Sequence, residues 1–384
     1  MKQKHIKEVT VFTDGDSTQL NVWSNVPYFF TETLISKGIK VNRVDISASQ
    51  RLENLYYKTF HFLARLINRA TTYDYVRCYT HYWLTRKRIK KALARFPDSD
   101  VDIFLTFSFS SVGFTHRPIV QFCDWTYAHY LSYFAGRKPD FFEKQAIKRE
   151  DRQILGSDWV FPLFPSVAEL MKKRYGSDKI FYLGNVINSL YDVSDDDIQA
   201  KRTAKNILFV GGEKYIDGAI SLIEAYRNLK PSCLPLSLHI VGLEKTAFGT
   251  LPDGISCYGY LDKAKDNERT LYYKLLREAS VFVNTTPKWG AFSASIEAMY
   301  FHTPVIVSPY SEFLSTFGKD IGFGAYCSEN TAEAIATSIQ GVLQSNSYTE
   351  YCYASNDAVK EFTWSAYIDK VIAKIESRFP TQYD

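Results

Sequence analysis

The sequence lacks the features that would indicate a membrane span, a disulfide framework or a nucleic-acid-binding surface. No apolar run reaches the ~18 residues that a membrane-spanning helix requires. The six cysteines are scattered and include no CxxC pair, which favours reduced thiols over disulfides or a zinc site. The formal net charge of +4 is small and no recognised nucleic-acid-binding module occurs, so no nucleic acid is expected as a partner.

The sequence also lacks a signal peptide, internal repeats and an obvious metal-binding motif. The N-terminal residues MKQKHIKEVTVF are charged and contain no apolar stretch typical of a signal peptide, so we expect a cytoplasmic protein. Tandem repeats and low-complexity segments are also absent. No carboxylate pair of the DxD type follows a strand in a way that would require Mg²⁺, and we therefore expect neither a metal nor another cofactor.

The composition is typical of a globular protein with more than one domain. Of the 384 residues, 46% are hydrophobic and 23% are charged, which leaves enough apolar material for sizeable cores. At ~150 residues per domain, two or three domains are expected. Strand and helix patterns alternate in two series, separated by a polar, acidic linker at residues 189–206. This alternation predicts an α/β fold with two doubly wound domains.

The most informative stretch is VFVNTTPKWGAFSASIEAMYFHTPVIVS, residues 281–308. It reads as a strand, a loop of small and turn-forming residues at 285–293, a helix at 294–300 and a second strand. A loop that leads into a helix N-terminus presents unpaired N–H groups and a positive dipole, which suit a phosphate. Glu297 lies one turn into the helix, where its carboxylate can accept hydrogen bonds from vicinal hydroxyls such as those of a ribose. The alternative is a structural βαβ unit with a surface glutamate.

The segment IEAMYFHTPVIVS resembles the donor-binding signature of the retaining glycosyltransferases of family 4, which have the GT-B fold. The resemblance implies two Rossmann-like domains facing a central cleft, with a C-terminal helix that crosses back to the N-terminal domain. We expect an acceptor-binding domain at residues 1–188 with the helix at 362–384, and a nucleotide-sugar-binding domain at 189–361. The family glutamate that binds the nucleotide ribose corresponds to Glu297, whereas the position of the first family glutamate is Trp289.

The glycine loop FVGGEKYIDG resembles the family's phosphate-binding loop, in which an arginine and a lysine hold the diphosphate. Here Gly212 stands at the arginine position and Asp217 lies near the lysine position. Lys214 and Lys288 are the nearest cations, and we expect at least one of them to replace the missing pair. The alternatives are two solvated lysines or a donor that carries less charge.

These segments together give the expected donor site. Tyr260 lies in a GYLD turn that corresponds to the family's base-contacting turn, where it would pack near the nucleobase or, alternatively, in the core. The donor-binding residues that the resemblance implies are Gly211, Gly212, Lys214, Tyr260, Phe292, Ser293, Ser295 and Glu297. The expected catalytic residues are Asp124, Lys288 and Glu297.

In the N-terminal domain, DWTYAHYLSYF follows a strand pattern and resembles the Asp-Ala-Thr-Phe segment of a family-4 subgroup. Asp124 and Thr126 match that segment. Many members carry a histidine at the position of Cys123, and His129 either substitutes for it or is a packing residue. The polar loop at residues 14–25 resembles the family's first loop without its pair of glycines, or is simply solvated. The expected contacts to acceptor or sugar are Asp16, Ser17, Trp125, Thr126 and His129.

Residues 51–96 combine positive charge with aromatic side chains. The segment has eleven lysines and arginines against two acidic residues, with ten aromatic residues interleaved. Basic amphipathic helices of this kind bind anionic membrane surfaces, with aromatic rings at the level of the lipid headgroups. The alternative is that the aromatics pack on the sheet while the cations face water.

The sequence and the resemblance predict a glycosyltransferase that moves a sugar from a nucleotide-sugar donor to a glycan or lipid-linked glycan acceptor, with retention and without a metal, in bacterial surface polysaccharide biosynthesis. We expect it in the cytoplasm, peripherally at the inner face of the plasma membrane. Two alternatives remain open. A non-catalytic nucleotide-sugar-binding relative, or a partner subunit of another transferase, would account for the missing glutamate, arginine and lysine. A sugar-nucleotide epimerase would need further acid–base residues.

Overall fold

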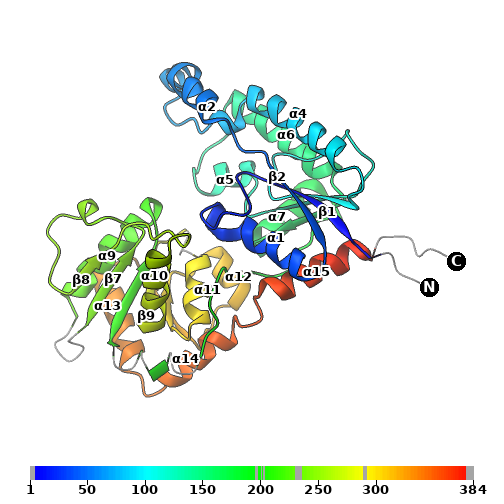
Figure 1. The fold of residues 1–384 in the computed structure, drawn as a ribbon. Helices are drawn as coiled ribbons and strands as arrows, with labels where there is room; N and C mark the ends of the chain where they lie inside the picture. Colours follow the sequence, from blue (N-terminus) through cyan, green and yellow to red (C-terminus); the bar gives the residue numbers. More distant parts are fainter. Residues whose placement is uncertain are drawn as a thin grey trace. The chain divides into compact units, whose positions relative to one another are not determined.

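The computed structural model describes residues 5–194, 198–199, 201, 204–229, 236–288 and 292–377. The chain divides into two compact units, the first made of residues 1–185 and 364–384 and the second of residues 186–363. Each unit is built around one parallel sheet flanked by helices (Figure 1). Trp289, which stands where the family has its first glutamate, lies outside the described residues.

The first unit contains a five-stranded parallel sheet in the order β2-β1-β3-β4-β5. Its strands are β1 (Glu8–Thr13), β2 (Lys40–Asp45), β3 (Val101–Phe104), β4 (Ile119–Cys123) and β5 (Trp159–Pro162). Every residue of β3 and β5 is buried, and so are most residues of β1 and β4. Parallel strands covered on both faces are mostly apolar, and here they also bury polar residues such as Asp102 of β3 and Gln121 of β4.

Helices precede or follow each strand of this sheet. They are α1 (Val26–Ser36), α4 (Tyr79–Arg95), α5 (Tyr127–Tyr133), α6 (Phe141–Gly156), α7 (Pro165–Tyr175) and α15 (Trp364–Glu376). The last helix, α15, belongs to the first unit, where the Trp364 ring packs against Phe30 and Phe122 at centroid distances of 6.0 and 6.3 Å. The predicted return of the C-terminal helix to the N-terminal domain is therefore confirmed.

Between β2 and α4 the chain forms a helical segment of residues 50–67, called here the projecting segment. It comprises α2 (Gln50–Tyr56), the π-helical turn η2 (Tyr57–His61) and α3 (Phe62–Ile67), and lies at an extremity of the first unit (Figure 1). Phe62 and Leu66 are 60% and 68% exposed, and no residue of α2 or η2 is buried. The alternative that all the aromatics of residues 51–96 pack on the sheet is therefore wrong for this segment.

The second unit contains a six-stranded parallel sheet in the order β11-β10-β9-β6-β7-β8. Its strands are β6 (Asn206–Val210), β7 (Ser237–Val241), β8 (Ile255–Cys257), β9 (Ala279–Asn284), β10 (Val305–Val307) and β11 (Gly324–Tyr326). Its helices include α9 (Ile216–Arg227), α10 (Asp266–Glu278), α11 (Phe292–Tyr300), α12 (Ser311–Phe317), α13 (Ala332–Leu343) and α14 (Tyr348–Asp357). Apolar residues of α9 and α13 pack with β6 in one core cluster, for example Leu222, Ile339 and Phe209.

In both sheets the order of strand addition reverses at one point. In the first unit β1 lies between β2 and β3, and in the second unit β6 lies between β7 and β9. Doubly wound sheets bind ligands outside the carboxyl ends of the strands on either side of such a reversal. The fold therefore directs attention to the loops after β1 and β3, and to those after β6 and β9.

The region predicted to be a polar, acidic linker, residues 189–206, contains helical structure and a buried lysine. Residues 198, 199, 201 and 204 are helical. The Lys201 side chain is 1% exposed, and its ammonium donates to the carbonyls of Leu276, Arg277 and Ala279 and to the Thr303 hydroxyl at 2.9–3.1 Å. Two of these carbonyls belong to the last turn of α10, where a cation also complements the negative end of the helix dipole.

We expect Lys201→Met to lower the free energy of unfolding by about 2–4 kcal/mol, because several buried acceptors lose a charged donor at once. Urea unfolding monitored by circular dichroism measures this change. Lys205→Met, at an exposed position of the same segment, is the matched control and should change stability little. A Lys201→Met protein as stable as the control variant would contradict a stabilising role for this ammonium.

Candidate functional site

At the strand reversal of the second unit, two loops meet at close range. Gly211 and Gly212 follow β6, and Thr286 follows β9, which is the neighbouring parallel strand. A Cβ on Gly218, in the first turn of α9, would lie 2.3 Å from the Thr286 hydroxyl oxygen, and a Cβ on Gly242 would lie 2.6 Å from the Gly211 carbonyl oxygen. These glycines therefore allow the backbone of the loops to approach closely beside the first turn of α9, and a helix N-terminus can bind a phosphate.

The end of β9 is lined by polar groups, and one of them lacks a partner. The Thr286 N–H donates to Asn284 Oδ1 (3.2 Å), and the Thr286 carbonyl accepts from the Ser308 hydroxyl (2.8 Å). Thr285 Oγ1 donates to Asn330 Oδ1 (2.6 Å). The Thr286 hydroxyl itself is buried and makes no hydrogen bond within the described part of the chain. A buried polar group without a partner is uncommon in proteins and is consistent with a ligand contact.

Glu297 on α11 is buried, so the surface-glutamate alternative is wrong. Its carboxylate forms an ion pair with Lys263 Nζ at 2.7 Å and accepts from the Tyr272 hydroxyl at 2.8 Å. The Lys263 and Glu297 side chains are only 12% and 7% exposed. Lys263 also donates to the Asn188 carbonyl (3.3 Å) and lies 4.4 Å from the centroid of the Tyr272 ring. Burial and the Glu297 charge raise the pKa of Tyr272, which keeps its hydroxyl protonated as a donor.

The contact between Lys263 and Glu297 is a feature that the sequence analysis missed. Lys263 directly follows the GYLD turn, but it is separated from Glu297 by 34 positions, and no local pattern relates the two. Among the described residues, one carboxylate oxygen of Glu297 accepts from Lys263 and the other from Tyr272, and each oxygen has a further lone pair. A ribose hydroxyl can therefore bind Glu297 only by sharing the carboxylate with Lys263 and Tyr272.

The remaining expected donor residues fall into two groups. Phe292 and Ser295 are buried, and the Phe292 ring packs against Phe313 at a centroid distance of 6.0 Å, which gives it a role in the core of the unit. Ser293 is exposed on the first turn of α11. Tyr260 is 70% exposed, so the alternative that it packs in the core is wrong.

The two candidate phosphate-binding lysines lie at the same edge of the sheet. Lys214 is in a 3₁₀ turn that follows β6 (Glu213–Tyr215), and its Nζ lies 5.1 Å from the centroid of the Tyr215 ring. Lys288 is in the loop that follows β9. Because β6 and β9 are adjacent and parallel, both loops leave the sheet at its carboxyl edge. Both lysines are exposed, as is Asp217 at the family's lysine position.

In the first unit, the loop after β1 has a strained backbone. Gly15 adopts a φ of +111°, and a Cβ there would lie 2.9 Å from a Val22 methyl carbon, so the position requires glycine. Three consecutive residues before α1 have positive φ angles of 37°, 52° and 71°: Trp23, Ser24 and Asn25. Such conformations cost about 1–3 kcal/mol each for non-glycine residues and concentrate at functional sites. The strained backbone is a feature of the kind found at functional sites, and both the functional and the solvated interpretation of this loop remain predictions.

Asp16 and Ser17 are in this loop. Asp16 Oδ1 accepts from the Thr18 N–H (2.9 Å) and hydroxyl (2.8 Å), and these hydrogen bonds lower the pKa of Asp16. Asp16 is exposed, and its lowered pKa keeps the carboxylate ionised at neutral pH. The Ser17 side chain is 1% exposed, and its hydroxyl has no hydrogen-bond partner within the described residues.

The residues after β4 form an aromatic stack. The Trp125 ring stacks on His129 with a centroid distance of 4.7 Å and an interplanar angle of 8°. Thr126 caps α5 by accepting the His129 N–H (3.2 Å), and Asp124 Oδ1 accepts the Trp125 N–H (2.8 Å). Burial lowers the pKa of His129 to about 4, so its imidazole is neutral at pH 7. β1 and β4 are parallel strands of one sheet. The candidate residues that follow β1 and those that follow β4 therefore lie at the same carboxyl edge.

Within the described residues, no group of three or more histidines, cysteines, aspartates or glutamates is placed to hold a metal ion. None of the described helices is long and apolar enough to cross a membrane.

Comparisons with known proteins agree with this geometry. Residues 204–345 match the family model described as "Glycosyl transferases group 1". A comparison with curated proteins found no match. Among solved structures, sucrose-phosphate synthase from Thermosynechococcus elongatus aligns at a TM-score of 0.67 with 15% identity, covering 97% of this chain and 100% of that one.

Two further structures align over similar lengths. A glycosyltransferase from Rickettsia africae ESF-5 gives a TM-score of 0.63 with 12% identity, covering 98% of this chain and 100% of that one. HepE from Anabaena, in complex with UDP and glucose, gives a TM-score of 0.61 with 12% identity and the same coverage. The predicted α/β fold with two Rossmann-like domains is confirmed: the chain has the GT-B fold, and together with the family-model match over residues 204–345 these findings support a GT-B glycosyltransferase.

Proposed function

We propose that the chain is a glycosyltransferase that moves a sugar from a nucleotide-sugar donor on the second unit to a glycan or lipid-linked glycan acceptor on the first. The observation that supports this best is the arrangement at the reversal between β6 and β9. The Thr286 hydroxyl is buried without a partner, and Gly218 brings the first turn of α9 against it. A phosphate oxygen placed there would accept from this hydroxyl and from the N–H groups at the start of α9.

The donor's charge and its ribose would be held by separate groups. A diphosphate carries more charge than the partial charges of helix N-termini can balance, so a cation is required nearby. Lys214 and Lys288, on the two loops that flank the reversal, are proposed to supply it. Glu297 is proposed to accept from the ribose hydroxyls, with Lys263 and Tyr272 fixing the orientation of its carboxylate. The structure of HepE with UDP and glucose supports a nucleotide sugar as donor.

The proposed reaction proceeds with retention of configuration at the transferred sugar. In the family that the sequence resembles, the leaving phosphate assists deprotonation of the acceptor hydroxyl, and the protein acts by positioning and by stabilising charge. In this chain Asp16 and Asp124, at the carboxyl edge of the first sheet, are proposed to orient the acceptor and the sugar. His129 is neutral at pH 7 and suits packing against a sugar ring better than binding an anion.

We further propose that the protein acts peripherally at the inner face of the plasma membrane, in bacterial surface polysaccharide biosynthesis. Nineteen large hydrophobic residues are exposed in the described part of the chain, and eleven of them lie within residues 50–83 or at 141–142. Residues 51–96 also have nine more basic than acidic side chains. Exposed apolar side chains beside lysines and arginines match the composition of surfaces that bind anionic bilayers.

A thermal-shift panel of UDP-, GDP-, dTDP-, ADP- and CMP-sugars tests the donor assignment. A donor present at about 100 times its Kd should stabilise the native protein by about 2.7 kcal/mol, which is a measurable rise in Tm. The stabilising donor is then incubated with candidate acceptors, and products are identified by mass. Binding without hydrolysis or transfer would favour the non-catalytic alternative, and a product of unchanged mass would indicate an epimerase.

We expect transfer activity to persist in EDTA. The charge on the leaving phosphate would be balanced by lysines and backbone N–H groups rather than by Mg²⁺. Initial rates are compared with EDTA, with EDTA and excess Mg²⁺, and with neither. A complete loss in EDTA that Mg²⁺ or Mn²⁺ restores would contradict the metal-independent mechanism.

A further inference from the structure

A cavity of about 740 Å³ lies in the first unit between α5, α6 and α7. Its apolar wall includes Ile147, Val167 and Met171. Its charged lining consists of six cations and one carboxylate: Arg137, Lys138, Lys144, Lys148, Lys173, Arg174 and Asp151. The cavity is called here the basic groove.

Most of the positive charge in the basic groove is not neutralised by the protein. Arg174 pairs with Asp151 at 2.7 Å, and Arg137 pairs with Glu143 at 2.6 Å. None of the four lysines forms an ion pair with a carboxylate of the described residues: Lys138, Lys144, Lys148 and Lys173. The lining has five more positive than negative side chains, whereas the whole chain has a net charge of only +4. The groove is therefore one of two regions of the chain with an excess of positive charge, the other being residues 51–96.

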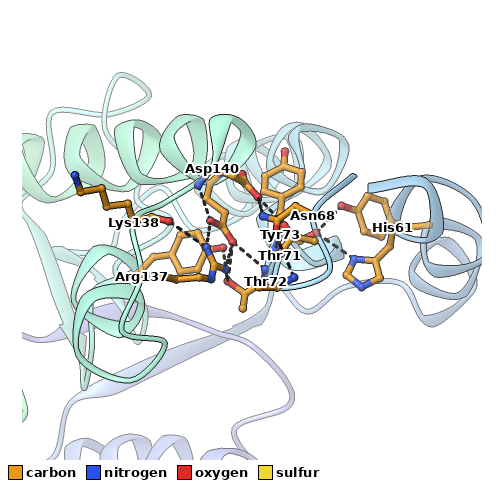
Figure 2. Close-up of polar contacts among 12 residues, drawn as sticks. His61, Asn68, Thr71, Thr72, Tyr73, Arg137, Lys138 and Asp140 are labelled. Atoms are coloured by element: carbon orange, nitrogen blue, oxygen red, sulfur yellow. Dashed lines mark hydrogen bonds and ion pairs between the residues drawn. The ribbon is translucent and has the colours of Figure 1, made fainter. Parts of the chain in front are cut away.

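One wall of the groove is held rigid by the buried carboxylate of Glu143. Glu143 accepts both terminal nitrogens of Arg137 at 2.6 and 2.8 Å, the Thr72 N–H at 2.8 Å and the Asp140 N–H at 2.8 Å. Burial by itself would raise the pKa of Glu143, but these hydrogen bonds lower it to about 2, so the carboxylate stays ionised. Figure 2 shows this network, from which the Lys138 side chain points away. The charge of Arg137 is thus paired with Glu143 within the protein, whereas the four lysines are available to bind a ligand.

One end of the groove is formed by residues already implicated in acceptor binding. Thr126 and His129 line it, and they directly follow β4 at the carboxyl edge of the sheet. The His129 ring continues the stack of Trp125 and Tyr133, at centroid distances of 4.7 and 5.5 Å. A stack of flat rings beside a basic cavity offers surfaces both for the apolar faces of sugar rings and for negative groups.

We infer that the basic groove binds the negatively charged groups of a glycan acceptor that carries phosphate, sulfate or carboxylate substituents. This inference rests on the proposed function, because it assigns the acceptor class to the unit proposed to bind the acceptor. The groove is concave, whereas a bilayer is flat, and seven of the nineteen exposed large hydrophobic side chains of the described residues lie on the projecting segment, against one, Leu170, in the groove. An anionic glycan fits the groove, and a membrane surface fits the projecting segment.

Binding of a fluorescent sulfated dextran oligosaccharide, compared with its unsulfated counterpart of equal length, tests the inference. We expect the wild-type protein to bind only the sulfated probe at about 0.15 M salt, where the screening length is about 8 Å, and to bind it more weakly as salt is raised. The variant Lys144→Gln/Lys148→Gln/Lys173→Gln should bind it roughly tenfold more weakly or worse, since three lysine–anion contacts are lost. All three lysines are exposed, so this variant should fold, which its Tm verifies.

The matched control is Lys58→Gln/Lys90→Gln/Lys91→Gln, which removes the same charge from exposed positions of residues 51–96. It should retain binding of the sulfated probe and lose binding to vesicles that contain anionic lipid. Three results would overturn the inference: an equal loss of probe binding in both variants, no probe binding by the wild-type protein, or a groove variant that loses vesicle binding while it retains probe binding.

Donor hydrolysis by the wild-type protein without acceptor, measured in parallel, separates the two proposals. Probe binding without hydrolysis of any nucleotide sugar leaves the anion groove in place and counts against the transferase. Hydrolysis of a nucleotide sugar without probe binding counts against the anion groove and leaves the transferase proposal in place.

Discussion

Replacing both Lys214 and Lys288 with alanine should lower turnover on the true donor by about 10²–10³-fold, the usual loss when a preorganised group that stabilises transition-state charge is removed. A diphosphate leaving group gains negative charge as the glycosidic bond breaks, and helix dipoles supply only partial positive charge. Lys214 and Lys288 lie in the loops that follow the adjacent strands β6 and β9, at the carboxyl edge of the sheet. Because the interaction strengthens in the transition state, turnover should fall more than KM rises.

Steady-state kinetics of the two single variants and the double variant measure this effect. Lys288→Ala should have the larger single effect, because its loop leads into α11. The control variant is Lys205→Ala/Lys274→Ala, which has the same change of charge. Lys205 immediately precedes β6 at the opposite edge of the sheet, and the Lys274 side chain is 64% exposed on α10. If the double variant of Lys214 and Lys288 keeps wild-type turnover, the proposal is wrong, and a donor with a single phosphate becomes the better account.

Glu297→Ala should destabilise the second unit by about 3–5 kcal/mol in addition to weakening donor binding, because it leaves the Lys263 ammonium buried without its partner. The side chains of the pair are 7% and 12% exposed, so solvent screens their interaction little. A loss of donor affinity in this variant therefore does not by itself identify a ribose contact. The substitution has to be made in a background that removes the buried charge as well.

The double variant Lys263→Met/Glu297→Gln provides that background. It removes both charges and leaves an amide oxygen that can accept from Tyr272, so most of the lost stability should return in urea unfolding. Donor affinity by calorimetry should nevertheless remain about 1.5–3 kcal/mol below wild type, the value of hydrogen bonds to a charged group. Lys265→Met/Glu268→Gln removes a neighbouring ion pair whose lysine and glutamate side chains are 61% and 23% exposed, and should change stability and affinity far less. Wild-type donor affinity in the Lys263→Met/Glu297→Gln protein would show that Glu297 has only a structural role.

Local features of this protein could be predicted from the sequence because they depend on neighbouring residues. The strand, loop, helix and strand at residues 281–308 follow from a β-branched run, small residues and a Thr-Pro stop, and the structure has β9, α11 and β10 there. The alternation of strands and helices likewise predicted two parallel sheets. The glycine loop after β6 could also be recognised from its own neighbouring residues.

Features that depend on which elements meet were decided only by the tertiary structure. The sequence already places Glu297 one turn into a helix, but only the packing of α10 and α11 buries its side chain against Tyr272 and Lys263. Lys201, in a segment that reads as a polar linker, is buried because the end of α10 offers it carbonyl acceptors from 75 or more residues away. Positive charges that are scattered over residues 137–174 form one basic groove because α6 and α7 lie side by side. Hydrophobic periodicity and turn chemistry act over a few residues, whereas the environment of a charge is set by strand order and helix packing, which those local patterns do not specify.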